Sequence, residues 1–235
     1  MTTTARESPA GTRLGAWAAA LTLVFVPVLA SCADDAESSD PTGTMVSDGD
    51  EPADPPADVA EPAASFSSEV TAGDTEVAVS YHLTNDGDEP LLVVDRLPTP
   101  SGSDFTTAQV YVSGQDDGRV LLSQRVFPWP DSDRINYAQA PQVGVTTVAP
   151  GETVSADVAV PLPLERRHPF GQDIGYGEIA LPGPVTDVVF CLGVIPPPFE
   201  PSLGRDHVDG VTTVDHGNES HEAQYLFCSK PTAIG

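Results

Sequence analysis

Residues 75–85 read TEVAVSYHLTN, with a large apolar side chain at every second position: Val77, Val79, Tyr81 and Leu83. Small or polar residues, among them His82, occupy the positions between these. Successive side chains of a strand point to opposite faces of a sheet, so this alternation predicts a half-buried β-strand. His82 is therefore expected at the surface.

A turn and a second strand follow directly. Residues 85–88 (NDGD) combine residue types that favour tight turns, and residues 91–97 (LLVVDRL) form another run suited to a strand. The simplest interpretation is a β-hairpin made of residues 75–85 and 91–97.

The same pattern predicts further strands along the chain. One pair of apolar runs flanks an Asp-Gly turn, another flanks a Pro-Gly turn, and two late runs are apolar enough to be central strands. No stretch after the first 31 residues keeps a 3.6-residue period, so helix should be scarce. The expected strands are residues 105–113, 120–127, 142–148, 153–160, 185–195 and 225–229.

Residues 66–235 are thus predicted to be all-β, with about eight short strands in an antiparallel β-sandwich. A small barrel is the main alternative. The strand ending in Asn-Asp-Gly, the return strand and the later Pro-Gly-Glu turn resemble the immunoglobulin-like domains of bacterial surface proteins. That resemblance spans much of residues 66–230 and lacks the cysteine and tryptophan spacing of antibody domains. It implies architecture only, because fold does not carry function.

Residues 1–31 have the order of a secretory signal. Two arginines and one glutamate precede the uncharged apolar run LGAWAAALTLVFVPVLA at residues 14–30. Residues 29–32 (LASC) then resemble the lipobox of bacterial lipoproteins, which implies that Cys32 receives diacylglycerol before the signal is removed. The alternatives are ordinary cleavage beside the cysteine and a retained transmembrane helix, since 17 apolar residues are near the lower limit for crossing hydrocarbon.

Residues 32–65 are predicted to be the lipidated cysteine and a disordered tether. After Cys32 this stretch has ten acidic residues, five prolines and no basic or aromatic residue. It cannot bury enough apolar surface to offset the entropy of ordering, so a spacer is expected, with an acidic binding tail as the alternative. The formal charge of the whole chain, −25 at pH 7, argues against nucleic acid and anionic lipid surfaces as partners. Membrane contact is expected through the N-terminal lipid.

The two remaining cysteines, Cys191 and Cys228, lie in strand-like segments of a protein expected in an oxidising compartment. A structural disulfide between them is predicted. A redox-active or metal-binding pair is the alternative, although the two cysteines lack Cys-x-x-Cys spacing.

Residues 205–222 (RDHVDGVTTVDHGNESHE) contain three of the five histidines, His207, His216 and His221, among several carboxylates. Imidazole and carboxylate groups together can bind zinc or another divalent ion. The spacings match no defined metal site, because Tyr225 stands where a His-Glu-x-x-His motif needs its second histidine. A solvated acidic loop is therefore the preferred interpretation, and a metal site is the alternative.

Residues 127–141 place Trp129, Arg134 and Tyr137 on a proline-rich loop. An exposed aromatic ring beside an arginine is a plausible partner-binding surface. The alternative is that Trp129 only covers the open end of the sandwich core. A basic spot at residues 166–168 (RRH) is expected to meet the acids of the domain itself or an anionic partner.

The chain contains no Gly-x-Ser-x-Gly elbow, no phosphate-binding glycine loop and no Cys-x-x-Cys pair, so no enzyme, catalytic residue or cofactor is expected. The sequence predicts a lipid-anchored protein on the extracytoplasmic face of the cell membrane, whose sandwich contacts another envelope protein. A metal-binding or metal-delivery lipoprotein that uses residues 205–222 is the alternative function.

Overall fold

The computed structural model describes residues 59–235 except residues 116, 133–134 and 176. Cys32, the signal segment, the tether as far as residue 58 and Arg134 lie outside the described residues. The described elements are β1 (Ala64–Ala72), β2 (Glu76–Asn85), β3 (Leu91–Pro98), β4 (Phe105–Thr106), β5 (Tyr111–Gly114), β6 (Arg119–Gln124), β7 (Gln142–Val148), β8 (Thr153–Pro161), β9 (Asp187–Ile195), η1 (Pro201–Leu203), β10 (Asp206–Val208), β11 (Val211–Asp215), α1 (Asn218–Glu222), β12 (Tyr225–Cys228) and β13 (Thr232–Ala233).

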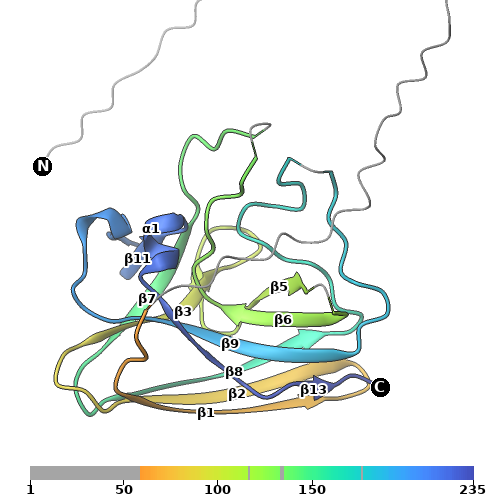
Figure 1. The fold of residues 1–235 in the computed structure, drawn as a ribbon, viewed down its shortest axis with the longest axis horizontal. Coiled ribbons are helices and arrows are strands. Elements are labelled where there is room, and N and C mark those ends of the chain that lie inside the picture. The colour runs from red at the N-terminus through yellow and green to blue at the C-terminus, as the bar shows by residue number, and fades with distance from the viewer. Residues whose placement is uncertain (1–58, 116, 133–134, 176) are drawn as a thin grey trace, which may run out of the picture. The chain divides into compact units, whose positions relative to one another are not determined.

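The strands form two sheets packed face to face, which confirms the prediction of an all-β sandwich (Figure 1). The small sheet has the order β1-β2-β8. The large sheet runs β10-β11-β7-β3-β9-β6-β5, and β12, β13 and β4 pair with its inner strands. One pair departs from the expected antiparallel arrangement, because β6 runs parallel to β9.

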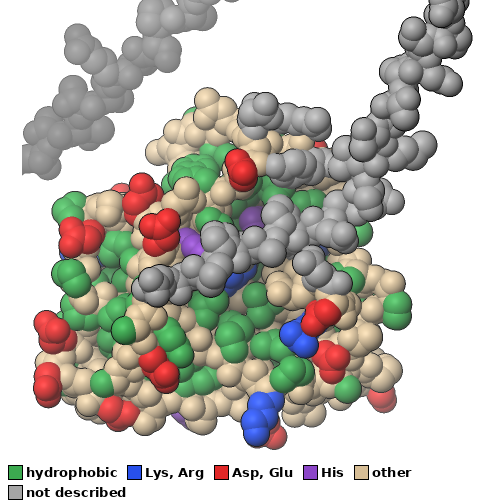
Figure 2. Space-filling model, in the orientation of Figure 1, with side chains coloured by type: hydrophobic (Ala, Val, Ile, Leu, Met, Phe, Trp, Pro, Cys, Tyr) green, Lys and Arg blue, Asp and Glu red, His purple; other side chains and the backbone are tan. Residues whose placement is uncertain are grey.

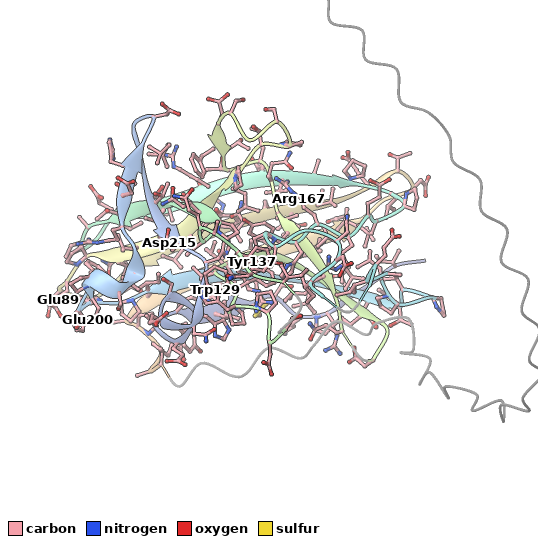
Figure 3. All side chains as sticks on the ribbon, turned by 90° about the horizontal axis from the view of Figure 1, so that it is seen from above. Glu89, Trp129, Tyr137, Arg167, Glu200 and Asp215 are labelled. Carbon is pink, nitrogen blue, oxygen red and sulfur yellow. A yellow bond between two sulfur atoms is a disulfide. The ribbon has the colours of Figure 1, made fainter. Side chains whose placement is uncertain are left out.

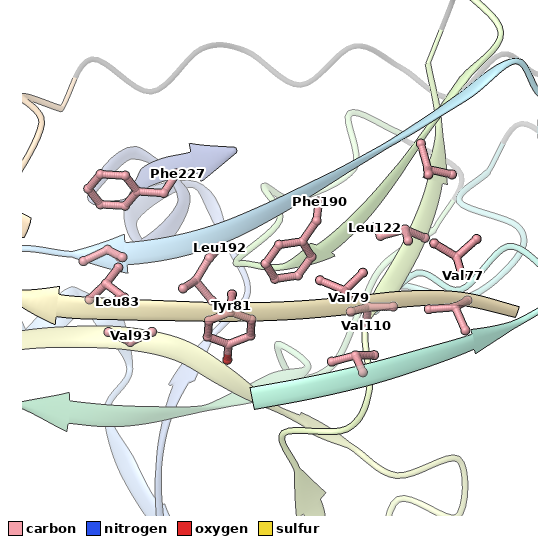
Figure 4. Close-up of a cluster of buried hydrophobic side chains, with 14 of the residues drawn as sticks. Val77, Val79, Tyr81, Leu83, Val93, Val110, Leu122, Phe190, Leu192 and Phe227 are labelled. Carbon is pink, nitrogen blue, oxygen red and sulfur yellow. The ribbon is translucent and has the colours of Figure 1, made fainter. Parts of the chain in front are cut away.

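The core between the sheets is built on the alternation of β2 (Figure 4). The four large apolar side chains of β2 are all buried, whereas His82 is exposed as expected. Tyr81 stacks on Phe190 of β9 at a centroid distance of 5.3 Å. β8 repeats the pattern with Val158 and Val160 facing inward. Alternation at this period therefore does specify which face of the small sheet is buried.

The large sheet has a second apolar layer on its other face. Val94 of β3, Val145 of β7 and Ile195 of β9 belong to a separate buried cluster, together with Phe127 and Phe170 from loops. The middle strands of the large sheet are thus covered on both sides. This explains why β3 and β9 are buried almost without interruption instead of alternating.

The predicted hairpin of residues 75–85 and 91–97 is wrong. β2 pairs with β1 and β8, whereas β3 pairs with β7, β9 and β4 in the other sheet. The turn after β2 is a corner between sheets, and so is the Pro-Gly turn between β7 and β8. Asn85 joins the two corners: its carbonyl accepts from the Gly151 N–H at 2.8 Å, and its buried amide donates to the Val148 carbonyl at 2.9 Å.

The expected hairpin around the Asp-Gly turn and the expected disulfide are both confirmed. β5 and β6 form an antiparallel hairpin around the Asp-Gly turn. β12 pairs with β9 so that Cys191 lies directly opposite Cys228, and the two are joined by a disulfide.

β1, β10, β11 and β13 were not expected as strands. β1 begins at Ala64, two residues before the predicted start of the domain. Its inward positions include alanine and serine, which carry little apolar signal.

A β-bulge places a carboxylate in the protein interior. The register between β3 and β7 shifts at Asp95, because Val94 faces Val145 while Arg96 faces Gly144. Asp95 is 1% exposed and accepts from the Thr146 hydroxyl, with distances of 2.9 and 2.8 Å to its two oxygens. Burial raises the pKa of Asp95 to about 6, against the lowering effects of Thr146 and of Arg96, whose Nε lies 3.9 Å away.

In the described part of the chain, no helix has the length and apolar character needed to span a membrane.

Candidate binding site

The three histidines proposed as metal ligands do not converge. His207 lies on β10 and is exposed, whereas His216 and His221 are buried. Among the residues that the structure describes, no three His, Cys, Asp or Glu side chains are grouped so that they could hold a metal ion. The preferred interpretation of a solvated loop is also wrong, since the segment forms β10, β11 and α1.

His216 instead serves as a hydrogen-bonding group inside the second apolar layer. The backbone N–H of Phe127 donates to Nδ1 at 3.0 Å, so the neutral ring carries its proton on Nε2, 2.9 Å from the Tyr111 hydroxyl. Burial, assisted by the nearby Arg125, lowers the pKa of His216 to about 3. A ring that is buried and bonded through both nitrogens is not available to a metal.

Trp129 and Tyr137 do come together: they are labelled side by side in Figure 3, and their ring centroids are 5.6 Å apart. Both rings pack on Phe170, with centroid distances of 5.2 and 5.0 Å, and both are half-buried. The backbone N–H of Trp129 donates to Asn218 Oδ1, and the Tyr137 hydroxyl donates to the Phe170 carbonyl. These contacts make the two rings a cover over the second apolar layer, and partner binding by their exposed edges stays a prediction.

The basic spot at residues 166–168 is folded into the domain. Arg166 is buried and donates to the Gly171 carbonyl at 2.7 Å, while the His168 ring lies 4.4 Å from that of Phe127. Arg167 is half-buried, and its guanidinium donates to the side-chain oxygen of Gln109 and to the Pro98 carbonyl. Within the described residues, Arg167 has neutral oxygen partners and no carboxylate, contrary to the expected pairing with the acids of the domain.

A groove that the sequence did not predict lies beside Arg167. It has a volume of about 600 Å³ and runs between β8 of the small sheet and β5 of the large sheet. Its apolar lining includes core side chains of both sheets, and Arg167 and Glu165 belong to its polar lining. The lining residues that also belong to the main core are Val110, Val112, Val158 and Val160.

The groove exists because the sandwich is open along this side. Val112 is bridged to Arg167 through two backbone hydrogen bonds of 2.8 and 2.9 Å, so the β5 side is covered by one added segment. β8 pairs with β2 and, among the described residues, with no strand on its other side. On the opposite side of the sandwich, β1 approaches β13 closely enough for the Thr232 hydroxyl to reach the Val70 carbonyl at 3.4 Å.

Sequence reasoning missed the groove because its residues come from two stretches that are far apart in the chain, 100–112 and 158–167. The one local signal was the pair of arginines in a strongly acidic chain.

Comparisons of the chain with protein-family models, with curated proteins and with solved structures gave no match. The function must therefore be inferred from the residues of the chain itself.

Proposed function

We propose that this protein is an extracytoplasmic binding protein, anchored by lipid at Cys32, whose β-sandwich contacts another envelope component through the groove between β8 and β5. The observation that carries the proposal is the groove itself. It is concave and largely apolar, with a few polar groups at its margin, which is the usual composition of a binding site.

The distribution of charge on the domain supports binding to a selected partner. Figure 2 shows acidic side chains spread over one face of the domain, with basic side chains in only a few spots. In Figure 3 the labelled Glu89 and Glu200 lie at one end of the domain, well away from Arg167. An apolar groove with a local cation on an acidic surface selects by shape and by charge together.

Binding, as opposed to catalysis, also agrees with the placement of the histidines. Two of the residues best suited to general acid–base chemistry pack against the second apolar layer. His216 is buried, and the ring of the half-buried His168 lies 4.4 Å from that of Phe127. Burial lowers the pKa of both, and backbone N–H groups donate to both rings. Side chains used in this way stabilise the loops that cover the large sheet.

The proposal is tested by capture of partners from bacterial membranes with the full-length protein. Ala108 is an exposed residue that lines the groove, and Ala108→Trp should fill the groove and reduce the captured partner at least tenfold. The matched control is Ala233→Trp, an exposed alanine outside the groove, which should capture as the wild type does. Cys32→Ala should abolish lipid labelling and release the protein from membranes.

Each part of the proposal can fail separately. Equal capture by Ala108→Trp and wild type would rule out the groove as the contact surface. Unchanged lipid labelling of Cys32→Ala would rule out the anchor.

A further inference from the structure

We propose that the groove receives an extended polypeptide segment, which pairs with β8 as an added strand and places a carboxylate near Arg167. This inference rests on the proposed binding function and specifies the chemistry of the partner. It follows from the free edge of β8, from the shape of the groove and from the charge of Arg167.

The hydrogen-bonding direction along β8 follows from its pairing with β2. The Leu162 N–H donates to the Thr75 carbonyl at 2.8 Å, and the Asn85 N–H donates to the Glu152 carbonyl at 2.9 Å. The register between these two bonds is continuous. Because backbone groups of an antiparallel strand alternate in direction, even-numbered residues of β8 bond to β2. The N–H and C=O groups of Ser155, Asp157 and Ala159 therefore point away from β2.

These outward backbone groups are available for another strand. Among the described residues, no strand pairs with β8 on that side. The opposite wall of the groove is different, since the backbone of Val112 is already bonded to that of Arg167. An incoming strand would thus pair with β8 alone. Side chains at every second position of that strand would lie over Val158 and Val160.

The free edge distinguishes a polypeptide from a hydrocarbon ligand. An acyl chain in the groove would cover backbone groups of Ala159 and its neighbours without offering them any hydrogen bond. A buried donor or acceptor that loses water without gaining a partner is destabilising. An extended polypeptide fills the same apolar space and also satisfies the edge, which is the basis of strand addition.

The charge of Arg167 further restricts the chemistry of the incoming segment. Arg167 is a half-buried cation in a chain of formal charge −25, and the described residues give it no carboxylate. An acidic side chain or a terminal carboxylate on the incoming strand would complement it. The tether of this chain is acidic but unsuited, because residues 33–58 contain Met45 and Val46 as their only large apolar residues. The segment therefore belongs to another protein.

The test uses the full-length lipidated protein in detergent and a defined probe, a nine-residue peptide of alternating valine and serine that ends in glutamate. Hydrogen–deuterium exchange should slow at least tenfold at the amides of Asp157 and Ala159 when the peptide binds. The amides of Val158 and Val160 serve as internal controls, because their direction already pairs them with β2. A peptide N-methylated at alternate residues should bind at least tenfold more weakly.

Matched variants of the protein test each contact. Ala159→Pro removes one outward N–H that the described fold does not use, which is a change that edge strands tolerate. This variant should bind the peptide at least tenfold more weakly. Ala159→Ser keeps that N–H and should bind as the wild type does. Arg167→Gln should weaken binding of the peptide that ends in glutamate. It should not change binding of a C-terminally amidated peptide that ends in glutamine, because that peptide has no carboxylate.

Several outcomes would overturn the inference. They are equal binding by the N-methylated and unmodified peptides, equal binding by a folded Ala159→Pro, or palmitate occupying the groove in place of the peptide. If Ala159→Pro does not melt cooperatively, the N-methylated peptide decides alone. Suppose that Ala108→Trp loses partner capture but that peptide binding does not depend on the outward amides of β8. The proposed binding function would then stand, and strand addition would be ruled out.

Discussion

Asp95 is the buried carboxylate whose energetic effect can be measured most directly. Its folded pKa is about 6, raised by burial above the value of 3.8 expected in the unfolded chain. A raised pKa contributes stability that is complete below the unfolded value and is lost as pH rises through the folded value. Ionised Asp95 therefore destabilises the fold at neutral pH by about 3 kcal/mol at most.

We expect Asp95→Asn to increase the free energy of unfolding at pH 7.5 by about 1–3 kcal/mol, and to change it less at pH 4. Urea unfolding at both pH values checks this. Asp157→Asn, at an exposed carboxylate on β8, is the control and should have little effect. A loss of stability at pH 7.5 larger than at pH 4 would mean that attraction to Arg96 outweighs burial.

His216 has the opposite pH dependence. Its pKa is lowered to about 3 in the folded state, so its stabilisation is present above the unfolded pKa near 6.5 and is lost as pH falls. Between pH 7 and pH 5 this loss is about 2 kcal/mol. His216→Asn keeps an acceptor for the Phe127 N–H, and should flatten the pH dependence of stability by that amount.

Unfolding midpoints measured from pH 7 to pH 5 test this prediction, with the exposed His82→Asn as the control. An unchanged slope in His216→Asn would show that the ring is protonated without unfolding the domain.

At the scale of strands, alternation predicted β2 and β8 together with the face that each one buries. The alternation in β2 and β8 is visible because one face meets the core and the other meets solvent. The corner after β2 could not be distinguished from a hairpin, because the same turn residues serve both. What separates the two cases is Asn85, whose partners lie at Val148 and Gly151, far along the chain.

The candidate sites show the same limit. The disulfide could be predicted because the assignment of Cys32 to lipid left Cys191 and Cys228 as one pair. The burial of His216 and the groove beside Arg167 depend on contacts between distant segments, which composition and spacing do not encode.

The disulfide joins β12 to β9, and its removal should destabilise the whole domain. It closes a loop with a sequence separation of 37 residues, which corresponds to about 4 kcal/mol in the chain-entropy description. We expect the double variant Cys191→Ser with Cys228→Ser to unfold at lower urea, and reductant to affect the wild type alone. Equal midpoints for wild type and variant would contradict a structural role for this bond.

At the scale of the molecule, the domain consists of three packed layers. The small sheet closes the main core, the middle strands of the large sheet are buried on both faces, and the loops that carry Trp129, Phe170 and His216 cover the outer face of those strands. The side where β1 meets β13 is nearly closed, whereas the side between β8 and β5 stays open. The open side is therefore the part of the sandwich best placed to gain contacts from a partner.

The corner after β2 also determines the order in which the domain can assemble. β2 can pair at once with β1, its neighbour in sequence, but its other partner is β8, whose residues follow much later. A chain that emerges from its N-terminal end must keep the apolar face of β2 uncovered until residues 153–161 arrive. Contacts this distant in sequence slow folding. A chain with this topology is therefore most prone to aggregate while β2 is present and β8 is still missing, and a chaperone that covers the apolar face of β2 would act during that interval.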